Sequence, residues 1–445
     1  MNDRLIVSRF GGNAAANSQE VKKTLEIIKA DSARRYLVVS APGATSDNVG
    51  ITDMLYMCYS SCHNHENYDA MLGAISARYK EIIDGLGMYF DVDAEIAALR
   101  QSLEGGMDLD YIGSRGEYII AKILADFLGW PFIDASNLIF FNMNGTPDTA
   151  KTFRIAGDIL RGLDRAVIPS FYGTLPNGKI KTFTRGDCDT AGALIACSAK
   201  ADLFEKWSED AKIYSTDPHV IPDAEIIRNV TYAEAVELNF IGIHVVWDSV
   251  AFMLEQAGIP MEICSTHNPT ESIMLITPKL PENITRSTAA CISGHKNFTA
   301  LHIQKYGLNK VYGFGEKLFG IFAKHRIACQ HYLTGIHKMC VILKDPVFDI
   351  RRDQILNDIN GVIAPDSVRV EKGLAMIAIV GEGMGTVKGI FRKVFDAIAH
   401  AGVKAKVIEH GADDLNIIVG VADEDYEKAI TSLYRFVVKN EEVPE

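Results

Sequence analysis

The sequence predicts an α/β protein that begins with a mostly parallel sheet covered by helices on both faces and ends in two smaller modules. Up to about residue 285, short β-branched runs alternate with segments of helical spacing, which is typical of βαβ units. Beyond that point the pattern changes and an internal repeat begins. At 445 residues the chain is longer than most single domains, so several domains are expected.

The first part of the chain shows this alternation repeatedly. We expect strands in the runs LIV, RYLVVS, RAVIPSFYG, DAKIYS and PMEICS, at residues 5–7, 35–40, 165–173, 210–215 and 260–265. We expect helices at residues 21–30, 114–129, 189–201 and 249–258. Ligands of such sheets bind at the carboxyl ends of the strands, so the residues after each strand are candidates for a binding site.

The second part of the chain repeats itself. Residues 318–343 align with residues 394–419 at a constant offset of 76, which places Ile327 on Val403. Each copy reads as helix, strand, glycine turn and strand, and each follows another apolar strand, FTALHI or AMIAIV. Two ferredoxin-like βαββαβ modules explain this pattern. Such modules serve as structural or dimerisation blocks or as sites of ligand control, and their place after a larger domain favours control.

Charge and composition exclude several classes of protein. The formal net charge of −12 argues against nucleic acid or an anionic membrane as a partner, because both attract basic surfaces. The sequence has no apolar run of about 18 residues and its beginning lacks the core of a signal peptide, so we expect a cytoplasmic protein. A cluster of Cys58, Cys62, His63 and His65 has no second pair at zinc spacing, so we expect a helix-end loop there and no metal site.

The stretch LIVSRFGGNAAAN, residues 5–17, ends a strand with a cation and two glycines. Gly11 and Gly12 form either a tight turn or a phosphate site, in which backbone amides and the start of the next helix meet an anion. Arg9 would add positive charge to such a site. The stretch matches neither the Walker pattern nor GxGxxG, so both interpretations stay open.

Two further segments place charged side chains where a helix begins. Ser114 and Glu117 have the spacing of a capping box, which explains Glu117 as well as a functional role does. Arg185, Asp187 and Asp189 precede a helix of small residues, and a helix cap accounts for only one acid. In phosphoryl transfer, a cation holds an anionic substrate while an acid positions a donor or magnesium, so these residue types favour that chemistry.

A fourth segment, residues 206–224, runs from a strand into a loop rich in Ser, Asp and Pro. It is either a surface turn or a shelf for adenine and ribose on which Tyr214 offers a flat face.

In order and spacing, these four segments resemble the aspartokinases of the amino-acid-kinase superfamily, over nearly the whole chain. RFGGN is similar to the family's Lys-Phe-Gly-Gly-Thr-Ser, SRGE to its Ser-x-Gly-Glu, and TRGDCDT to its Gly-Arg-Gly-Gly-Ser-Asp-Thr. WSEDAKIYSTDPHVIPDA is similar to the family's Trp-Thr-Asp…Tyr-x-x-Asp-Pro-Arg-x-x-Pro-Asp-Ala, and the repeat resembles its paired ACT modules.

The resemblance implies a three-layer αβα, carbamate-kinase-like catalytic domain at residues 1–285, followed by ACT domains at residues 286–360 and 361–445. In many relatives the second module lies inside the first, in which case Tyr426–Val438 returns to finish the first module's sheet.

The resemblance implies an activity as well. ATP, with Mg²⁺, would phosphorylate the side-chain carboxylate of L-aspartate to give 4-phospho-L-aspartate, the first step from aspartate toward lysine, threonine and methionine. Because the attacking carboxylate is already ionised, catalysis would rest on positioning and charge neutralisation.

Site residues follow from the same resemblance. Glu117 would hold the α-amino group of aspartate and Arg185 its α-carboxylate, while Ser46 or Thr45 would touch the substrate, with Ser46 fitting the spacing better. The implied catalytic residues are Arg9 and Asp189. The implied nucleotide contacts are Gly11, Gly12, Ser208, Glu209, Tyr214, His219 and His244.

Several positions depart from the family pattern, mainly on the phosphate side. Arg9 stands in place of a lysine, Asp187 in place of a glycine, and His219 and His244 in place of an arginine and a lysine. Losing one preorganised transition-state contact costs about 3 kcal/mol, or roughly 10²- to 10³-fold in rate. Two alternatives therefore stay open: a catalytically weak homologue that binds amino acids as a regulator, and a kinase for another carboxylate amino acid.

The paired modules imply an effector, lysine or threonine, bound between modules of two subunits. Candidate contacts lie in the turns at residues 333–338 and 410–416. ACT modules pair side by side, so a homodimer or a higher homo-oligomer is expected.

Overall fold

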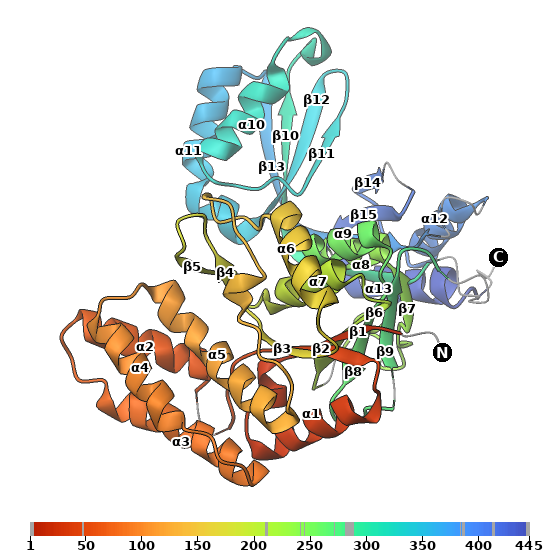
Figure 1. The fold of residues 1–445 in the computed structure, drawn as a ribbon. Coiled ribbons are helices and arrows are strands. Elements are labelled where there is room, and N and C mark those ends of the chain that lie inside the picture. The colour runs from red at the N-terminus through yellow and green to blue at the C-terminus, as the bar shows by residue number, and fades with distance from the viewer. Residues whose placement is uncertain are drawn as a thin grey trace. The chain divides into compact units, whose positions relative to one another are not determined.

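The computed structural model divides the chain into two compact units (Figure 1). The first unit comprises the chain up to residue 213 with residues 228–236 and 245–281, and the second comprises residues 214–227, 237–244 and 282–445. The boundary expected near residue 285 lies outside the described residues. Those described are 4–46, 49–209, 212–240, 242–243, 245–270, 272–280, 289–382, 384, 388–411 and 414–441.

The first unit is built on a seven-stranded sheet in the order β3-β2-β1-β6-β8-β9-β7. Neighbouring strands run parallel except β8 and β9, which confirms the mostly parallel sheet that the sequence predicts. The strands are β1 Ile6–Phe10, β2 Arg34–Val39, β3 Ala166–Pro169, β6 Leu203–Ser208, β7 Asn229–Thr231, β8 Met261–Ser265 and β9 Ser272–Thr277, and a separate hairpin pairs β4 Tyr172–Thr174 with β5 Ile180–Thr182.

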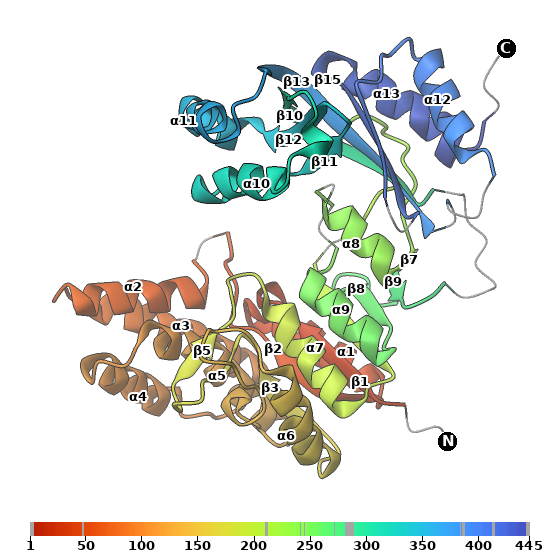
Figure 2. The ribbon, with the colours of Figure 1, turned by 90° about the horizontal axis from the view of Figure 1, so that it is seen from above.

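Helices lie on both faces of this sheet (Figures 1 and 2). Figure 1 shows helices α1 to α5 on one side of the sheet, while α6, α7 and α9 pack together on the other, with α7 against β1. The helices in this part of the chain are α1 Ser18–Ala30, α2 Ile51–His63, α3 Asp69–Leu86, α4 Val92–Glu104, α5 Leu109–Leu128, α6 Thr149–Arg161, α7 Cys188–Ala199, α8 Tyr232–Phe240 and α9 Asp248–Ala257.

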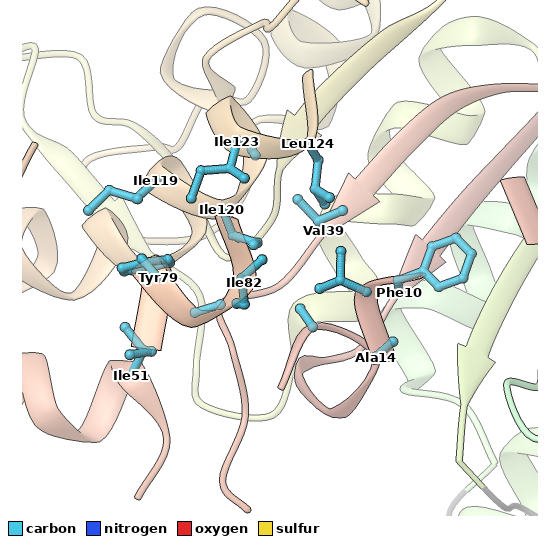
Figure 3. Packing of buried hydrophobic residues seen from close by; sticks show 14 of the residues in the cluster. Phe10, Ala14, Val39, Ile51, Tyr79, Ile82, Ile119, Ile120, Ile123 and Leu124 are labelled. Atoms are coloured by element: carbon cyan, nitrogen blue, oxygen red, sulfur yellow. The ribbon is translucent and has the colours of Figure 1, made fainter. Parts of the chain in front are cut away.

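A large core of the first unit lies between the sheet and α1 to α5. Figure 3 shows Phe10 of β1 and Val39 of β2 in one cluster with Ile120 and Leu124 of α5. Helix α5 presents a long apolar face to this core, begins at the cap Asp108, whose carboxylate accepts the amide hydrogen of Tyr111, and ends at a glycine with φ of 64°. Burial of this face packs α5 against β2 and β3.

One expected strand lies elsewhere. The sequence favours a strand at residues 210–215, of which 210 and 211 lie outside the described residues. Residues 212–215 form no named strand, and the structure has β6 earlier, at Leu203–Ser208. That earlier run pairs with β1 on one side and β8 on the other, whereas Tyr214 makes an isolated bridge with Ile226. Pairing with neighbouring strands, which the local pattern does not show, fixes where the strand forms.

The second unit is built on a six-stranded antiparallel sheet in the order β11-β12-β10-β13-β15-β14. The offset of 76 residues carries helix α10 onto α12 and strand β11 onto β14 end for end, which confirms the repeat. The elements are β10 Cys291–Gln304, α10 Phe314–Lys324, β11 His331–Thr334, β12 Lys338–Lys344, α11 Asp345–Ile363, β13 Ser367–Val380, α12 Ile390–His400, β14 Val407–His410, β15 Asn416–Ala422 and α13 Tyr426–Leu433.

Two four-stranded modules share the long strands β10 and β13. Residues 298–304 of β10 pair with β12 and with the first half of β13, and Leu301 packs in a core with α10 and α11. Residues 291–295 of β10 pair with the second half of β13, and Ile292 packs in a second core with α12 and α13. The second module is therefore completed by residues 291–295, which come before the rest of both modules in the chain.

The C-terminal segment differs from its expected role. Tyr426–Val438 is helical, as α13 followed by a π-helical turn at Tyr434–Val438, and it packs in the core of the second module. Strand β13 supplies the fourth strand of the first module, so this segment does not complete that sheet. The expected division at residue 360 falls inside α11.

Residues 214–227 belong to the second unit and are attached to its second module. The amide of Ile292 donates to the carbonyl of Ser215 at 2.8 Å, and the amide of Glu225 donates to the Tyr434 hydroxyl at 3.0 Å. No helix among the described residues is both long enough and apolar enough to cross a bilayer.

The substitution Tyr434→Phe tests this attachment. It removes the acceptor of the Glu225 amide, so we expect the free energy of unfolding of the second unit to fall by about 1 kcal/mol and the Glu225 amide to exchange hydrogen faster. Hydrogen exchange followed by mass spectrometry measures both effects. Tyr332→Phe is the control because Tyr332 is exposed on β11. Unchanged protection of Glu225 in Tyr434→Phe would contradict the attachment.

Candidate active site at the carboxyl edge of the sheet

Strands β1, β2 and β6 end together and place polar side chains at one edge of the sheet. In the register of β1 and β6, Arg9 lies opposite Lys206, and Ser40 follows the end of β2. The Arg9 guanidinium reaches the Ser40 hydroxyl at 3.5 Å, and Ser40 lies 3.1 Å from the hydroxyl of Ser170, which follows β3. This is the edge at which parallel sheets bind their ligands.

Asp189 holds the two cations together. Its Oδ1 lies 3.1 Å from Nη1 of Arg9, in an ion pair without hydrogen-bond geometry, and its Oδ2 lies 2.8 Å from Nζ of Lys206. The exposed fractions of the three side chains are 11% for Arg9, 4% for Asp189 and 21% for Lys206. The carboxylate of Asp189 thus pairs with both cations and holds them next to each other as a triad.

The pKa values of Asp189 and Arg9 are each set by burial, which disfavours the charged form, and by ion pairing, which favours it. Burial by itself raises the pKa of Asp189, but Arg9 and Lys206 more than offset it, so the pKa lies below its usual value. Burial lowers the pKa of Arg9, and Asp189 followed by Cys188 more than offsets this effect, so the net shift is upward. Asp189 and Arg9 therefore both stay charged near neutral pH.

The glycine turn lies against this triad. Strand β1 leads into a short 3-10 turn at Gly12–Ala15, and helix α1 begins only at Ser18. A Cβ atom on Gly12 would lie 2.9 Å from the carbonyl oxygen of Ala41, and one on Gly11 would lie 3.4 Å from Nη1 of Arg9. Glycine at position 12 is therefore required by close packing, and Gly11 keeps the backbone beside the guanidinium open.

Glu117 lies inside helix α5 and not at its cap, which removes the capping box as its explanation. It is buried, and its Oε2 has no hydrogen-bond partner among the described residues. Burial raises its pKa to about 8, although the amide of Ala41 stabilises the carboxylate. A buried carboxyl group with an unused oxygen is suited to a cationic ligand.

Arg185 lies on an exposed loop near the same carboxyl group. Its guanidinium donates to the carboxylate of Asp53 and lies 5.7 Å from the ring centre of Tyr56. Burial raises the pKa of Tyr56, the charge of Glu117 raises it further and the charge of Arg185 lowers it, so this ring interacts with both predicted substrate residues. The side chain of Arg185 is 60% exposed, which leaves it accessible to an anionic ligand.

The remaining predicted residues of the first unit lie on loops and strand ends. Thr45 and Ser46 follow β2 in the loop after Ser40, and Ser46 is exposed. Ser208 ends β6 with a buried hydroxyl that has no partner among the described residues, and the carbonyl of Glu209 accepts the Ser265 hydroxyl.

Three predicted nucleotide residues lie outside the first unit or outside the described chain. Tyr214 and His219 belong to the second unit, where Tyr214 packs against the core of the second module and His219 lines a surface groove with α12 and α13. His244 lies outside the described residues. The nucleotide role of all three stays a prediction.

Two residues at the centre of the site have no predicted role in the sequence analysis. Lys206 is the only cation in the mostly buried strand LFEKWS. A lysine in such a strand indicates an anionic partner, and this is the one local signal for its role. Cys188, between Asp187 and Asp189, contacts Arg9 and Ser40, and burial raises its pKa. Cross-strand register, which a sequence pattern does not show, brings Lys206 to the site.

Comparisons with known proteins identify the family of this chain. The model of the amino acid kinase family matches residues 4–265, and a model of the ACT domain matches residues 377–436. Aspartokinase 3 of Bacillus subtilis is 28% identical over 96% of this chain and 98% of its own length.

The solved structures that are similar to this chain include aspartate kinases. A crystal structure of Clostridium acetobutylicum aspartate kinase, described as an allosteric enzyme, is 34% identical with a TM-score of 0.90 and covers 98% of this chain and 100% of that one. Escherichia coli aspartokinase III, at 23% and 22% identity, shares the fold with TM-scores of 0.71 in its complex with aspartate and ADP and 0.74 in its complex with lysine and aspartate; each alignment covers 97% of this chain and 99% of that one. With a family model over more than half of its length and a 34% identical relative over nearly all of it, the chain belongs to the amino acid kinase family and, within it, to the aspartokinases.

Proposed function

We propose that this protein is an aspartate kinase, which transfers the γ-phosphoryl group of ATP to the side-chain carboxylate of L-aspartate and releases ADP and 4-phospho-L-aspartate. The observation that carries the proposal is the pairing of a buried cation site, Arg9 and Lys206 around Asp189, with the unused carboxyl oxygen of Glu117. The B. subtilis and C. acetobutylicum relatives bear the names aspartokinase and aspartate kinase, which supports the assignment.

Glu117 and Arg185 select the substrate. The α-ammonium group of aspartate would pair with Oε2 of Glu117, and the α-carboxylate would pair with the guanidinium of Arg185, displacing Asp53. Thr45 and Ser46 are the hydroxyls we assign to the same ligand. Two opposite charges at fixed positions favour an α-amino acid over a simple dicarboxylate.

The phosphate side acts by charge and position. Arg9 and the open backbone at Gly11 and Gly12 would hold the phosphates of ATP, while Asp189 keeps Arg9 fixed. The aspartate carboxylate attacks as an ion, so no residue needs to remove a proton from it. We assign Ser208 and Glu209, at the end of β6, to the rest of the nucleotide. The nucleotide roles that the sequence suggests for Tyr214, His219 and His244 stay predictions.

Mg²⁺ fits this scheme as a partner of the phosphates. The described residues contain no group of three or more His, Cys, Asp or Glu side chains placed to hold a metal by themselves, and Mg²⁺ in kinases is bound mainly by phosphates with one or two carboxylates. Asp187, at the N-terminus of α7, is the carboxylate we assign to it. Bound there, Mg²⁺ would neutralise charge on the phosphates.

Regulation is the role we assign to the second unit. One structure of the E. coli relative contains lysine, and the C. acetobutylicum relative is described as allosteric. We propose that lysine or threonine binds to the ACT modules of this chain and that the active form is a homodimer or a larger homo-oligomer. Titration of the enzyme with each amino acid during turnover identifies the effector.

The reaction is tested by incubating pure protein with ATP, Mg²⁺ and aspartate in the presence of hydroxylamine, which traps the acyl phosphate as aspartyl hydroxamate. We expect hydroxamate that depends on all three components. A panel of glutamate and other carboxylate amino acids decides the substrate. Absence of hydroxamate together with aspartate binding in calorimetry would favour a regulatory amino-acid-binding protein instead, as the departures at Arg9, Asp187, His219 and His244 allow.

A further inference from the structure

Lys206 lies in the candidate site in a way that no motif explains. It is opposite Arg9 on the neighbouring strand, near the carboxyl end of β6, and both side chains reach Asp189 in the first turn of α7. Gly11 closes the arrangement, because its amide donates to the carbonyl of Trp207, the residue after Lys206. The second cation and the glycine turn therefore share one end of the β1 and β6 pair.

The charges at this place do not balance. Arg9 and Lys206 carry two positive charges and Asp189 carries one negative charge, which leaves one positive charge among these three paired side chains. The Asp187 carboxylate also interacts with Arg9, but no ion pair between the two is formed among the described residues. Glu117 does not cancel it near neutral pH, because burial raises the pKa of this carboxyl group to about 8. An uncompensated buried charge is costly, so the cluster favours an anionic ligand.

The cluster also has unused hydrogen-bond donors. Nε of Arg9 is buried and has no hydrogen-bond partner among the described residues. The ammonium group of Lys206 has three N–H donors, and the ion pair with Asp189 occupies one of them. Lys206 is 21% exposed, compared with 4% for Asp189, so a ligand at the strand ends can reach its ammonium group.

We infer that Lys206 is a second catalytic cation that, together with Arg9, contacts the phosphoryl group during its transfer. This inference rests on the proposed kinase reaction. An oxygen of the aspartate side chain forms a bond to the γ-phosphorus while the bond from that phosphorus to the bridging oxygen of ADP breaks, and the electron pair leaves with ADP. Lys206 stays an ammonium ion throughout and neutralises charge on the transferring group.

A purely structural role for Lys206 makes different predictions. If the ammonium group served only to fix Asp189, its loss would reduce the stability of the fold and would weaken the binding of ATP and ADP to the same extent. Contact with the γ-phosphoryl group instead affects ATP more than ADP, because ADP lacks that group. The ratio of the two dissociation constants therefore separates a catalytic cation from a structural one.

The experiment compares Lys206→Met, Lys206→Gln and Lys206→Arg with the wild type. We expect Met and Gln to lower kcat by roughly 10²- to 10³-fold while KM for aspartate stays the same, and Arg to retain more activity because it keeps the charge. In calorimetry with Mg²⁺, Lys206→Met and Lys206→Gln should weaken the binding of ATP more than the binding of ADP. The inference would be overturned if these two variants bound ATP and ADP with equally reduced affinity, or if their kcat stayed close to that of the wild type.

Arg34→Met provides a matched control. Arg34 pairs with Glu205, the neighbour of Lys206 in β6, at 2.8 Å, and the exposed fractions of the two side chains are 14% and 3%. Its loss should lower the melting temperature without changing the ratio of ATP to ADP affinity. If the wild type makes no hydroxamate, the kinase proposal fails, and the affinity ratios of the Lys206 variants still decide whether this ammonium contacts the γ-phosphoryl group.

Discussion

Asp189→Asn is expected to remove most phosphoryl transfer and to lower the free energy of unfolding by about 3 to 5 kcal/mol. Asparagine leaves two neighbouring buried cations, Arg9 and Lys206, without their shared counterion. Repulsion would then move both away from the glycine turn, so we expect kcat to fall by roughly 10²- to 10³-fold. Denaturant unfolding and the hydroxamate assay measure the two effects.

Asp164→Asn is the control for this substitution. Asp164 pairs with Arg35 at 3.4 Å, but its side chain is 81% exposed, so we expect a change of less than about 1 kcal/mol. A stability of Asp189→Asn equal to that of the control would show that the buried ion pairs are not formed in solution.

Glu117→Gln is expected to lower kcat/KM for aspartate by roughly 10- to 10²-fold, which is the value of a hydrogen bond to a charged group. Glutamine fills the same space and replaces the carboxylate by a neutral amide, so ATP binding should stay unchanged. Steady-state kinetics with each substrate varied in turn measures this difference. An equal rise in KM for ATP would contradict a role limited to the aspartate side.

The same substitution should change how stability depends on pH. Because burial raises the pKa of Glu117 to about 8, the folded protein holds a proton that the unfolded chain releases above its ordinary pKa of 4.5. Wild-type stability therefore decreases as the pH rises from that ordinary value toward 8, and Glu117→Gln should lack this contribution. Unfolding curves at several pH values across this window measure the difference.

The sequence predicts the parts of the site that are local. Gly11 and Gly12 follow a strand directly, and Asp189 lies in the first turn of a helix, so spacing alone locates them. Lys206 could not be found in this way, because its role depends on β1 and β6 being neighbours although almost two hundred residues separate them in the chain. Glu117 looked like a cap because the pattern does not show that α5 begins at Leu109.

For the fold too, the sequence predicts local elements but not the pairing of strands that are distant in the chain. The period of 76 residues predicts two similar modules, and both form. The period does not show that residues 291–295 complete the second module from a position before the first, since strand pairing across such distances leaves no periodic signal. The helical Tyr426–Val438 segment differs from its expected role for the same reason.

The central claim is that a buried carboxyl group receives the ammonium group of aspartate beside a fixed pair of cations. Calorimetric titration of aspartate at about pH 7, with Mg²⁺ and ADP present and in buffers of different ionisation enthalpy, tests it directly. Glu117 must lose its proton to pair with the ammonium group, so the account predicts release of close to one proton for each aspartate bound. Binding with no proton release in the wild type, or the same release in Glu117→Gln, would contradict it.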